Sequence, residues 1–388
     1  MREVYVDNNA TTPVAPEVVE AMLPFFGEFF GNPASIHRFG ARAVIHCRAA
    51  REQVSAFLGA NPEEIVFTSC GTESNNAAIR GTLDCFPDKR HIVTTAVEHP
   101  AVRNLCAHLS DRGYAVTELS VDEQGHLNIA ELEDSLRDDT ALVSIMYANN
   151  ETGVLFPIEK IAPIVKTRGI ILHCDAVQAA GKVALDLSAL PVDLLSLSGH
   201  KLHAPKGIGV LYARKGTPLS PLLVGGHQER GLRAGTENVP YIVGLAKACE
   251  LAGKSLDTER TTVGPLRDRL EEGILSAISH CLINGDRENR LSNTSNISFE
   301  GIDGESAILF LNEFGIASSS GAACMSGVDT PSPVLRAMGV PASAIYGSIR
   351  FSLSRYNTGE DIDYILECLP PIIAKLREFS PGRPPRDP

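Results

Sequence analysis

The chain has 388 residues, a formal net charge of −12, 44% hydrophobic residues and 21% charged residues. This length allows two domains with a large core, and the negative charge argues against nucleic acid as the main partner. No apolar run approaches the roughly 18 residues of a membrane-spanning helix, and the first residues lack the apolar stretch of a signal peptide, so the sequence predicts a cytoplasmic protein without a membrane partner.

Strand and helix patterns alternate along the first two thirds of the chain. Short apolar runs predict strands at 64–68, 91–95, 114–119, 141–146, 170–173, 194–197 and 209–212. Several of these runs are apolar throughout, which is typical of strands covered on both faces. Helical patterns lie between them, such as one that begins near Ser74 and one over 157–167. The alternation predicts an α/β domain with a mainly parallel seven-stranded sheet.

The pattern changes after about residue 257. A long helix is expected over 258–279, then strands at 293–299 and 347–354, then a closing helix over 359–379. These elements indicate a smaller α+β domain. The predicted division is an N-terminal arm packing with the small domain (1–15), a large domain (16–257), a small domain (258–379) and a flexible, proline-rich tail (380–388).

Two neighbouring strand patterns are followed by side chains that suit an aldehyde cofactor. Asp175 follows the strand at 170–173, and Lys201 follows the strand at 194–197. Parallel strands bring their carboxyl ends to one edge of a sheet. A lysine amine can capture the aldehyde of pyridoxal phosphate, and a carboxylate can keep its ring nitrogen protonated. The pair predicts a pyridoxal phosphate site. Taken singly, a surface lysine and a helix-capping aspartate are the alternatives.

The chain has nine cysteines, an odd number, and no C-x-x-C pair. That is not typical of a disulfide framework or a zinc finger. Most of them, including Cys174, Cys249 and Cys368, are expected to be small core residues. The short histidine pair His200 and His203 has no third ligand nearby, so no resident metal is predicted.

Nine short motifs occur in an order that resembles one family. They are YVDNNATT (5–12), GNPASIH (31–37), TSCGTESNN (68–76), EH (98–99), NNETG (149–153), DAVQ (175–178), SGHK (198–201), RAGTEN (233–238) and SSGAACMSG (319–327). The chain resembles a cysteine desulfurase of the NifS/IscS type, in the class-V aminotransferase family of fold-type I pyridoxal phosphate enzymes. The resemblance implies a fold-type I transferase that converts L-cysteine to L-alanine and transfers the sulfur to an enzyme cysteine as a persulfide.

The resemblance implies a phosphate site. Gly71 and Thr72 lie in a strand-to-helix turn, where backbone N–H groups and the helix dipole favour an anion. Ser198 and His200 add side-chain donors, and Thr236 comes from the second subunit, which implies an obligatory homodimer. A simple helix cap is the alternative for Thr72.

The resemblance also implies how the cofactor ring and the substrate are held. His99 stacks on the ring and acts as an acid or base; a strand-end histidine facing water is the alternative. Asp175 pairs with the ring nitrogen. Gln178 and Asn150 contact the phenolic oxygen side of the ring or the substrate. Arg350 binds the substrate carboxylate, for which its planar fork is suited; an exposed ion pair is the alternative.

Cys324 lies among glycines, serines and alanines, a composition that predicts an exposed, mobile loop. It resembles the cysteine that attacks the substrate sulfur as a thiolate and then carries the persulfide, and it can transiently ligate an iron–sulfur cluster. In this scheme Lys201 removes the α-proton and His99 manages protons. The loop resembles the NifS/IscS subgroup more than the SufS-like one, with Met325 where threonine is common.

The family suggests an iron–sulfur scaffold protein of the NifU or IscU kind as the sulfur acceptor. Alternatives on the same scaffold are an aminotransferase, a selenocysteine lyase and a kynureninase-like hydrolase. An alternative of a different class is a sulfur-carrier or iron–sulfur module without catalysis. The presence of Lys201, Asp175 and His99 favours an enzyme.

Overall fold

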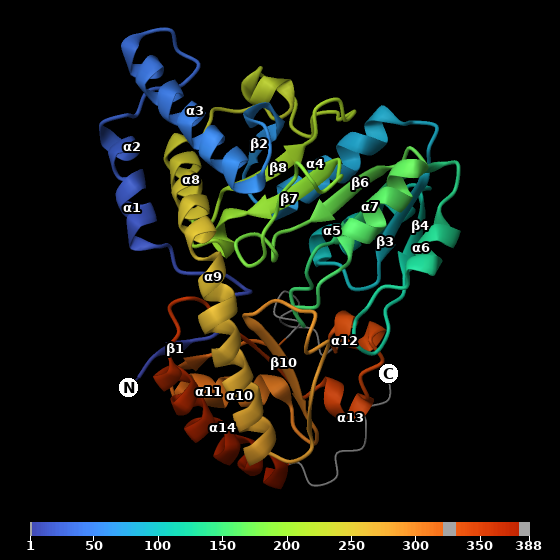
Figure 1. Cartoon of the computed structure of the whole chain (residues 1–388), viewed down its shortest axis with the longest axis vertical. Helices are drawn as coiled ribbons and strands as arrows, with labels where there is room; N and C mark the ends of the chain where they lie inside the picture. Colours follow the sequence, from blue (N-terminus) through green and yellow to red (C-terminus); the bar gives the residue numbers. More distant parts are fainter. Residues whose placement is uncertain (1, 321–330, 380–388) are drawn as a thin grey trace.

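The computed structural model of the protein describes residues 2–320 and 331–379. Its largest feature is a seven-stranded sheet with the strand order β2-β8-β7-β6-β5-β3-β4 (Figure 1). The strands are β2 (Ile65–Thr68), β3 (His91–Thr95), β4 (Ala115–Leu119), β5 (Thr140–Met146), β6 (Ile171–Asp175), β7 (Leu194–Ser198) and β8 (Gly209–Ala213). All are parallel to their neighbours except β8, which is antiparallel to β7 and β2. The prediction of a mainly parallel seven-stranded sheet is confirmed.

Helices cover both faces of this sheet. Because side chains alternate along a strand, Leu195 of β7 belongs to the apolar cluster on one face and Leu194 to the cluster on the other. The cluster of Leu195 includes side chains from α1 (Pro16–Met22), α2 (Pro24–Gly27), α3 (Arg38–Leu58), α6 (Ile129–Ser135), α7 (Ile158–Thr167) and α8 (Val239–Lys254). The cluster of Leu194 includes side chains from α4 (Gly71–Cys85) and α5 (Pro100–Ser110). The strands therefore form a buried middle layer.

A smaller unit lies below the large sheet in Figure 1. Strands β9 (Cys281–Ile283), β10 (Thr294–Phe299) and β12 (Ser348–Ser352) form an antiparallel sheet in the order β12-β10-β9. Ile297 and Ile349 join a core with α10 (Gly264–Ala277), α11 (Gly304–Glu313) and α14 (Gly359–Phe379). Their neighbours Asn296 and Arg350 pair across the sheet and lie on its other face. This face is polar and turned toward the large unit, since Asn296 donates to the carbonyl of Glu151 (3.3 Å).

The N-terminal arm packs on the smaller unit. Strand β1 (Val4–Tyr5) runs parallel to β11 (Ile316–Ala317), and Val4 belongs to the apolar core of that unit. Conversely, two side chains from late in the chain pack on the large sheet. Val334 of α12 (Pro333–Ala337) and Ile345 of α13 (Ala342–Ile345) belong to the apolar cluster of Leu195. The two units are thus tied together by crossing segments. The division into arm, two domains and tail stays a prediction, and the tail (380–388) lies outside the described residues.

The helix expected over 258–279 is interrupted. The structure has α9 (Leu256–Thr258), a π-helical turn (Glu259–Val263) and then α10. Pro265 follows at the start of α10. It has no N–H, and its ring collides with the carbonyl four residues earlier in a regular α-helix. A wider π turn avoids that collision, and such turns are frequent at functional positions.

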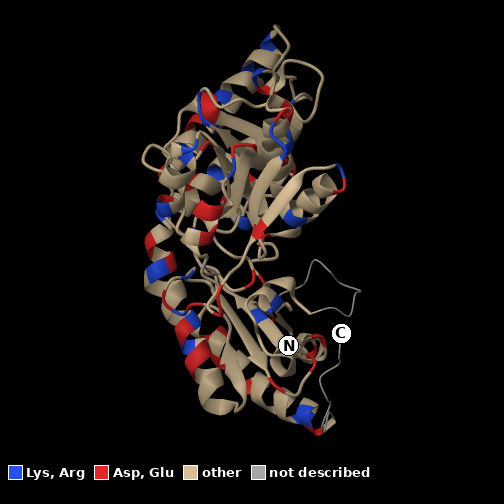
Figure 2. Cartoon of the chain, turned by 90° about the vertical axis from the view of Figure 1, so that its right-hand side faces the viewer, with Lys and Arg blue, Asp and Glu red and all other residues tan. Residues whose placement is uncertain are grey.

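Two other expectations differ in detail. Helix α4 begins at Gly71, three residues before the expected start, because Cys70 is extended and its sulfur caps the N–H of Glu73 (3.4 Å). Strands β1, β9 and β11 were not expected, since two or three residues carry no periodic signal. Acidic and basic residues are mixed over both units in Figure 2. Among the helices of residues 2–320 and 331–379, none has the length and apolar run needed to cross a bilayer.

Candidate active site

The carboxyl ends of β6 and β7 lie side by side at one edge of the large sheet. β6 ends at Asp175, which is in register with Ser196 of β7. β7 ends at Ser198 and continues directly into a single 3-10 turn, Gly199–Lys201. The strand ends therefore bring Asp175 and Lys201 to the same edge, as the sequence pattern predicts.

The Asp175 carboxylate is buried and oriented by two N–H donors. Asn75 Nδ2 donates to Oδ2 (2.6 Å), and the backbone N–H of Val177 donates to Oδ1 (3.0 Å). Each carboxylate oxygen has a further lone pair for a protonated ring nitrogen. Asn75 reaches the site from the first turns of α4 and is itself buried. The sequence motif contains Asn75, but its role as the orienting donor is visible only in the structure.

The Lys201 amine rests on the N-terminal segment. Its Nζ donates to the carbonyl of Ala10 (2.8 Å) and to that of Asn9. Gln178 Nε2 donates to the same Asn9 carbonyl (2.9 Å). The motif at 5–12 thus closes one side of the site, a role that its residues alone do not reveal.

His99 is the N-cap of α5 and is partly buried. Its Nδ1 accepts the backbone N–H of Ala101 (3.1 Å), so the ring proton is on Nε2. Burial lowers the pKa of His99, while the charge of Asp175 raises it and that of Lys201 lowers it further. The charges of both residues therefore act on His99, which is only partly buried. Stacking on the ring, like the alternative of a histidine facing water, stays a prediction for His99. The His99 ring is neutral at physiological pH and offers one N–H for proton transfer.

The turn between β2 and α4 approaches Ser198 closely. A Cβ on Gly71 would lie 2.8 Å from Val177 Cγ2 and 3.3 Å from Ser198 Cβ, so only glycine fits without displacement. As first residues of α4, Gly71 and Thr72 have N–H groups without a helical partner. Thr72 is exposed. The alternative of Thr72 as the helix cap is wrong, because Cys70 is the cap.

His200 and Thr236 have different surroundings. His200 Nδ1 hydrogen-bonds Thr11 Oγ1 (3.1 Å). Burial, with the charges of Lys201 and Lys206, lowers the pKa of His200 to about 4, so it is a neutral donor. Thr236 is exposed on the segment after Arg233. Arg233 anchors that segment to the first turn of α4 through an ion pair with Glu73 (2.9 Å).

Arg350 enters the site from β12. Its side chain is only 3% exposed, its Nη2 donates to Asp7 Oδ1 (2.8 Å), and its Nη1 donates to the carbonyl of Asn150 (3.0 Å). The alternative of an exposed ion pair is wrong, because Arg350 is buried and the Asp7 side chain is only 18% exposed. The Nε of Arg350 and the Oδ1 of Asn150 have no hydrogen-bond partner among the described residues. Unsatisfied buried polar atoms at a site are positions where a ligand can bond.

The backbone of Arg350 also holds one end of the predicted cysteine loop. Its N–H donates to the carbonyl of Ser319 (2.7 Å), and the N–H of Ser319 donates back (3.3 Å). At the other end, Ser332 Oγ donates to the buried Glu151 carboxyl (2.5 Å). Cys324 and Met325 lie outside the described residues. The two anchors nevertheless fix both ends of their segment beside the Arg350 site.

The chain is similar to known proteins over nearly its whole length. The family model described as aminotransferase class-V matches residues 4–365. The chain belongs to this family. It is 57% identical over 381 residues to a cysteine desulfurase of Trichormus azollae, covering 98% of this chain and 95% of that protein. It is 54% identical over 382 residues to the cysteine desulfurase NifS of Azotobacter vinelandii, with coverage of 98% and 95%. A solved structure of a NifS-like protein has a TM-score of 0.92, 42% identity and coverage of 97% and 100%.

These matches confirm the predicted class-V, NifS-like family and its fold-type I architecture. Pyridoxal phosphate is the cofactor of the family. The residues present fit that group: Gly71 leaves room for an anion at the helix start, and the Asp175 carboxylate has free lone pairs. Asn75 Oδ1, like Asn150 Oδ1, is a buried acceptor without a partner in the described residues.

Two buried titratable groups of this class-V site were not singled out from the sequence. Glu98, next to His99, accepts the N–H of Met146 and the hydroxyl of Thr95, both at 2.9 Å. Burial, with the charge of Asp175, raises the pKa of Glu98 to about 8. His173, two residues before Asp175, is a second such group, and burial lowers its pKa to about 4. Both are neutral at physiological pH, which limits the charge near Asp175.

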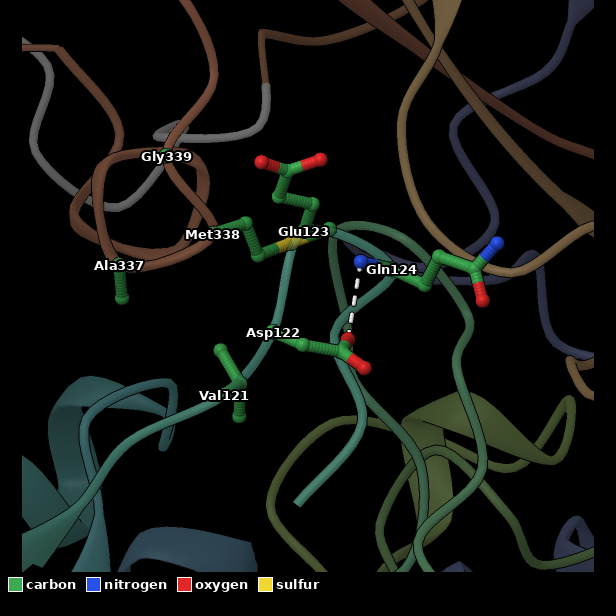
Figure 3. A pocket seen from close by; sticks show the side chains of 7 residues that line it. All are labelled: Val121, Asp122, Glu123, Gln124, Ala337, Met338 and Gly339. Carbon is green, nitrogen blue, oxygen red and sulfur yellow. Dashed lines mark hydrogen bonds between the residues drawn. The ribbon is translucent and has the colours of Figure 1, made fainter. Parts of the chain in front are cut away.

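A wide hollow lies away from these residues. It has a volume of about 610 Å³ and is lined by residues 121–124 of the large unit and by Ala337, Met338 and Gly339 (Figure 3). In the close-up, the backbone N–H of Gln124 bonds the Asp122 carboxylate (2.9 Å). None of the predicted site residues lines this hollow. It marks where the turn at 121–124 faces the end of α12.

Proposed function

We propose that the chain is a cysteine desulfurase that converts L-cysteine to L-alanine and places the sulfur on Cys324. The observation that carries the proposal is the grouping of Asp175, Lys201 and His99 at one sheet edge, with the buried guanidinium of Arg350 opposite them on Asn150. The relatives named cysteine desulfurase support it. A non-catalytic module would have no use for a carboxylate, an amine and an imidazole grouped beside the guanidinium of Arg350.

Bound pyridoxal phosphate supplies an electron sink that acidifies the α-hydrogen of the substrate. Arg350 holds the substrate carboxylate through a charge-assisted hydrogen bond. Lys201 Nζ takes the α-proton, and the Nε2–H of His99 supplies a proton on the substrate side. Asp175 holds the ring nitrogen in its protonated form.

The sulfur transfer is a nucleophilic displacement by Cys324. Its thiolate forms a bond to the substrate sulfur as the bond between that sulfur and the β-carbon breaks. The electron pair of the broken bond stays on the three-carbon fragment, which takes up protons to become alanine. One cysteine and one enzyme thiol thus give one alanine and one enzyme persulfide, without an external oxidant or reductant.

The test combines spectroscopy and product analysis. We expect a visible cofactor band that changes on addition of L-cysteine, followed by alanine release and a persulfide on Cys324. Cys324→Ser should keep the band and lose the persulfide, whereas Cys85→Ser, at the far end of α4, should behave like wild type. Alanine release at the wild-type rate from Cys324→Ser would refute the nucleophile. Amino transfer to a keto acid would favour the aminotransferase alternative.

We further propose a homodimer in which Thr236 completes the phosphate site of the partner. The supporting observation is a set of large apolar side chains that are exposed on α2, on the start of α3 and on the segments beside them, at the upper left of Figure 1: Leu23 (60%), Phe26 (60%), Phe30 (65%), Ile36 and Phe39. An apolar group of this kind indicates a surface that another protein covers. Thr236 is exposed, so its hydroxyl is accessible to a second subunit, as the family resemblance implies.

A mixed dimer tests this arrangement. In a dimer of one Thr236→Ala chain and one Lys201→Ala chain, a site shared between subunits keeps one complete copy of both residues, so about half of the wild-type activity should return. If Thr236 serves its own subunit, no site is complete and no activity returns. Sedimentation of the wild type should give a dimer, and a monomer with full activity would refute the proposal.

Sulfur delivery to an iron–sulfur scaffold of the NifU or IscU kind is proposed on the same family grounds. The exposed Leu309 and Phe314 of the smaller unit offer an apolar contact for such a partner. Transfer of labelled sulfur from the persulfide to a purified scaffold would support it, and retention on Cys324 in the presence of that scaffold would refute it. The cytoplasmic location stays a prediction.

A further inference from the structure

Lys182 contacts the candidate active site through Gln178. It lies four residues after Gln178, and its Nζ donates to the Gln178 carbonyl (3.0 Å) and to the Gln178 side-chain Oε1 (3.4 Å). An ammonium group has donors only. The Oε1 of Gln178 must therefore face Lys182, and the Nε2 must face away from it.

The nitrogen end of the same amide faces the N-terminal segment beside Lys201. Gln178 Nε2 donates to the carbonyl of Asn9 (2.9 Å), which also accepts from Lys201 Nζ. The oxygen and nitrogen of a glutamine amide have similar shapes, so only its partners select the orientation. Lys182 and the Asn9 carbonyl both favour the observed orientation. If the amide turned over, its N–H donors would face the ammonium of Lys182 and its oxygen would face the Asn9 carbonyl.

Lys182 also faces the connection between the two units. A small cavity of about 20 Å³, enough for a single water, is lined by Lys182, Lys201, Glu259 and Arg355, among others. Glu259 opens the π turn before α10 and is buried. Its Oε2 has no hydrogen-bond partner among the described residues. The buried carboxylate and the ammonium of Lys182 thus face one cavity from the two units.

The charges of the two groups act on each other. Burial raises the pKa of Glu259 to about 7, while the charge of Lys182 opposes that rise. Burial lowers the pKa of Lys182 to about 8, while the charge of Glu259 opposes that fall. Each group therefore favours the charged form of the other, and each loses that support if the π turn moves away.

We propose that Lys182 is a positioning residue that fixes the amide of Gln178 toward the cofactor and, through Glu259, links that orientation to the π turn between the two units. The inference rests on the proposed role of Gln178 at the phenolic oxygen side of the ring. The reaction steps proposed above use only Lys201. The inference gives Lys182, the second lysine at the site, a positioning role.

The test uses holoenzyme of Lys182→Met, Lys182→Arg and the surface control Lys160→Met on α7. Lys182→Met should shift the visible cofactor band and raise the cofactor dissociation constant about tenfold, the effect of one hydrogen bond. kcat should fall while the KM for L-cysteine stays the same. Lys182→Arg keeps N–H donors and should restore the band, and Lys160→Met should not change it.

A double-mutant cycle separates positioning from general stability. If Lys182 acts through Gln178, Lys182→Met should add no further change of the band or of cofactor affinity in a Gln178→Ala background. Glu259→Gln should shift the band in the same direction as Lys182→Met, by less. An unchanged band and affinity in Lys182→Met, or equal effects in both backgrounds, would overturn the inference.

The failure of this inference is distinguishable from that of the proposed function. If Gln178→Ala leaves the band unchanged, the ring-side role of Gln178 is wrong, and the role of Lys182 falls with it. If Gln178→Ala shifts the band and Lys182→Met does not, only the inference on Lys182 is wrong. Alanine and persulfide formation by the wild type decide the desulfurase reaction independently of both.

Discussion

Acidification should weaken this fold through the buried His173. Its side chain lies in the middle of β6, where Nδ1 hydrogen-bonds Ser144 Oγ and Nε2 hydrogen-bonds Ser196 Oγ, both at 2.9 Å. The residue is fully buried, and burial lowers the pKa of His173 to about 4, although the charge of Asp175 opposes the fall. The folded protein therefore holds a neutral ring that an unfolded chain would protonate more easily.

The expected loss follows from proton linkage. The pKa of a histidine in an unfolded chain is about 6.5. Between that value and about 4, the unfolded state binds more protons than the folded state, so the free energy of unfolding falls as the pH falls. The loss from His173 alone is near zero at pH 7.5, about 2 kcal/mol at pH 5 and about 3 kcal/mol below pH 4.

The assay is urea-induced unfolding of the wild type, His173→Gln and His108→Gln at pH 7.5 and pH 5. His108 is exposed at the end of α5 and serves as the matched control. Between the two pH values, the wild type and His108→Gln should each lose about 2 kcal/mol more than His173→Gln. His200 and His203 also have lowered pKa values, but their contribution to the loss of stability is the same in all three proteins and cancels in the comparison. Equal losses in all three would refute the reasoning.

Three further predictions concern the site. Lys201→Ala should be purified without the visible cofactor band and release no alanine, because the amine that captures the aldehyde is removed. Arg350→Lys should raise the KM for L-cysteine about tenfold with a smaller change in kcat, because the compact ammonium of lysine lacks the planar fork that holds the Asn150 carbonyl and a carboxylate from separate nitrogens; steady-state kinetics measure both constants. Between pH 5 and pH 8 the wild type should lose about 3.5 kcal/mol more stability than Glu98→Gln. The reason is that the folded state raises the pKa of Glu98 to about 8, so the folded wild type releases a proton as the pH rises.

Each of these has an outcome that contradicts it. A Lys201→Ala protein that keeps the band of the wild type would show that another amine holds the cofactor. An unchanged KM in Arg350→Lys would remove Arg350 from the substrate carboxylate. Parallel pH profiles of unfolding for the wild type and Glu98→Gln would mean that Glu98 is not held neutral by its burial.

Local pattern was sufficient for the large sheet and for part of the site. The seven apolar runs and the helical periods between them give the strands, because alternation and burial act on neighbouring residues. Asp175 and Lys201 were expected at one edge because parallel strands end together. The turn at Gly71 also follows from local pattern, because an apolar strand run ends just before it and a helical pattern begins just after it. The family motifs then supplied roles for residues such as Arg350.

The tertiary structure alone decided which distant groups meet. Lys201 reaches the carbonyls of Asn9 and Ala10 across more than 190 positions, and Arg350 reaches Asp7 across 343. The pair of Lys182 and Glu259 joins two units across a cavity. Contacts of this kind leave no periodic trace in the sequence, because they depend on how whole elements pack. The chain by itself determined the sheet and the reactive residues at its edge, whereas packing determined their partners, their burial and therefore their protonation.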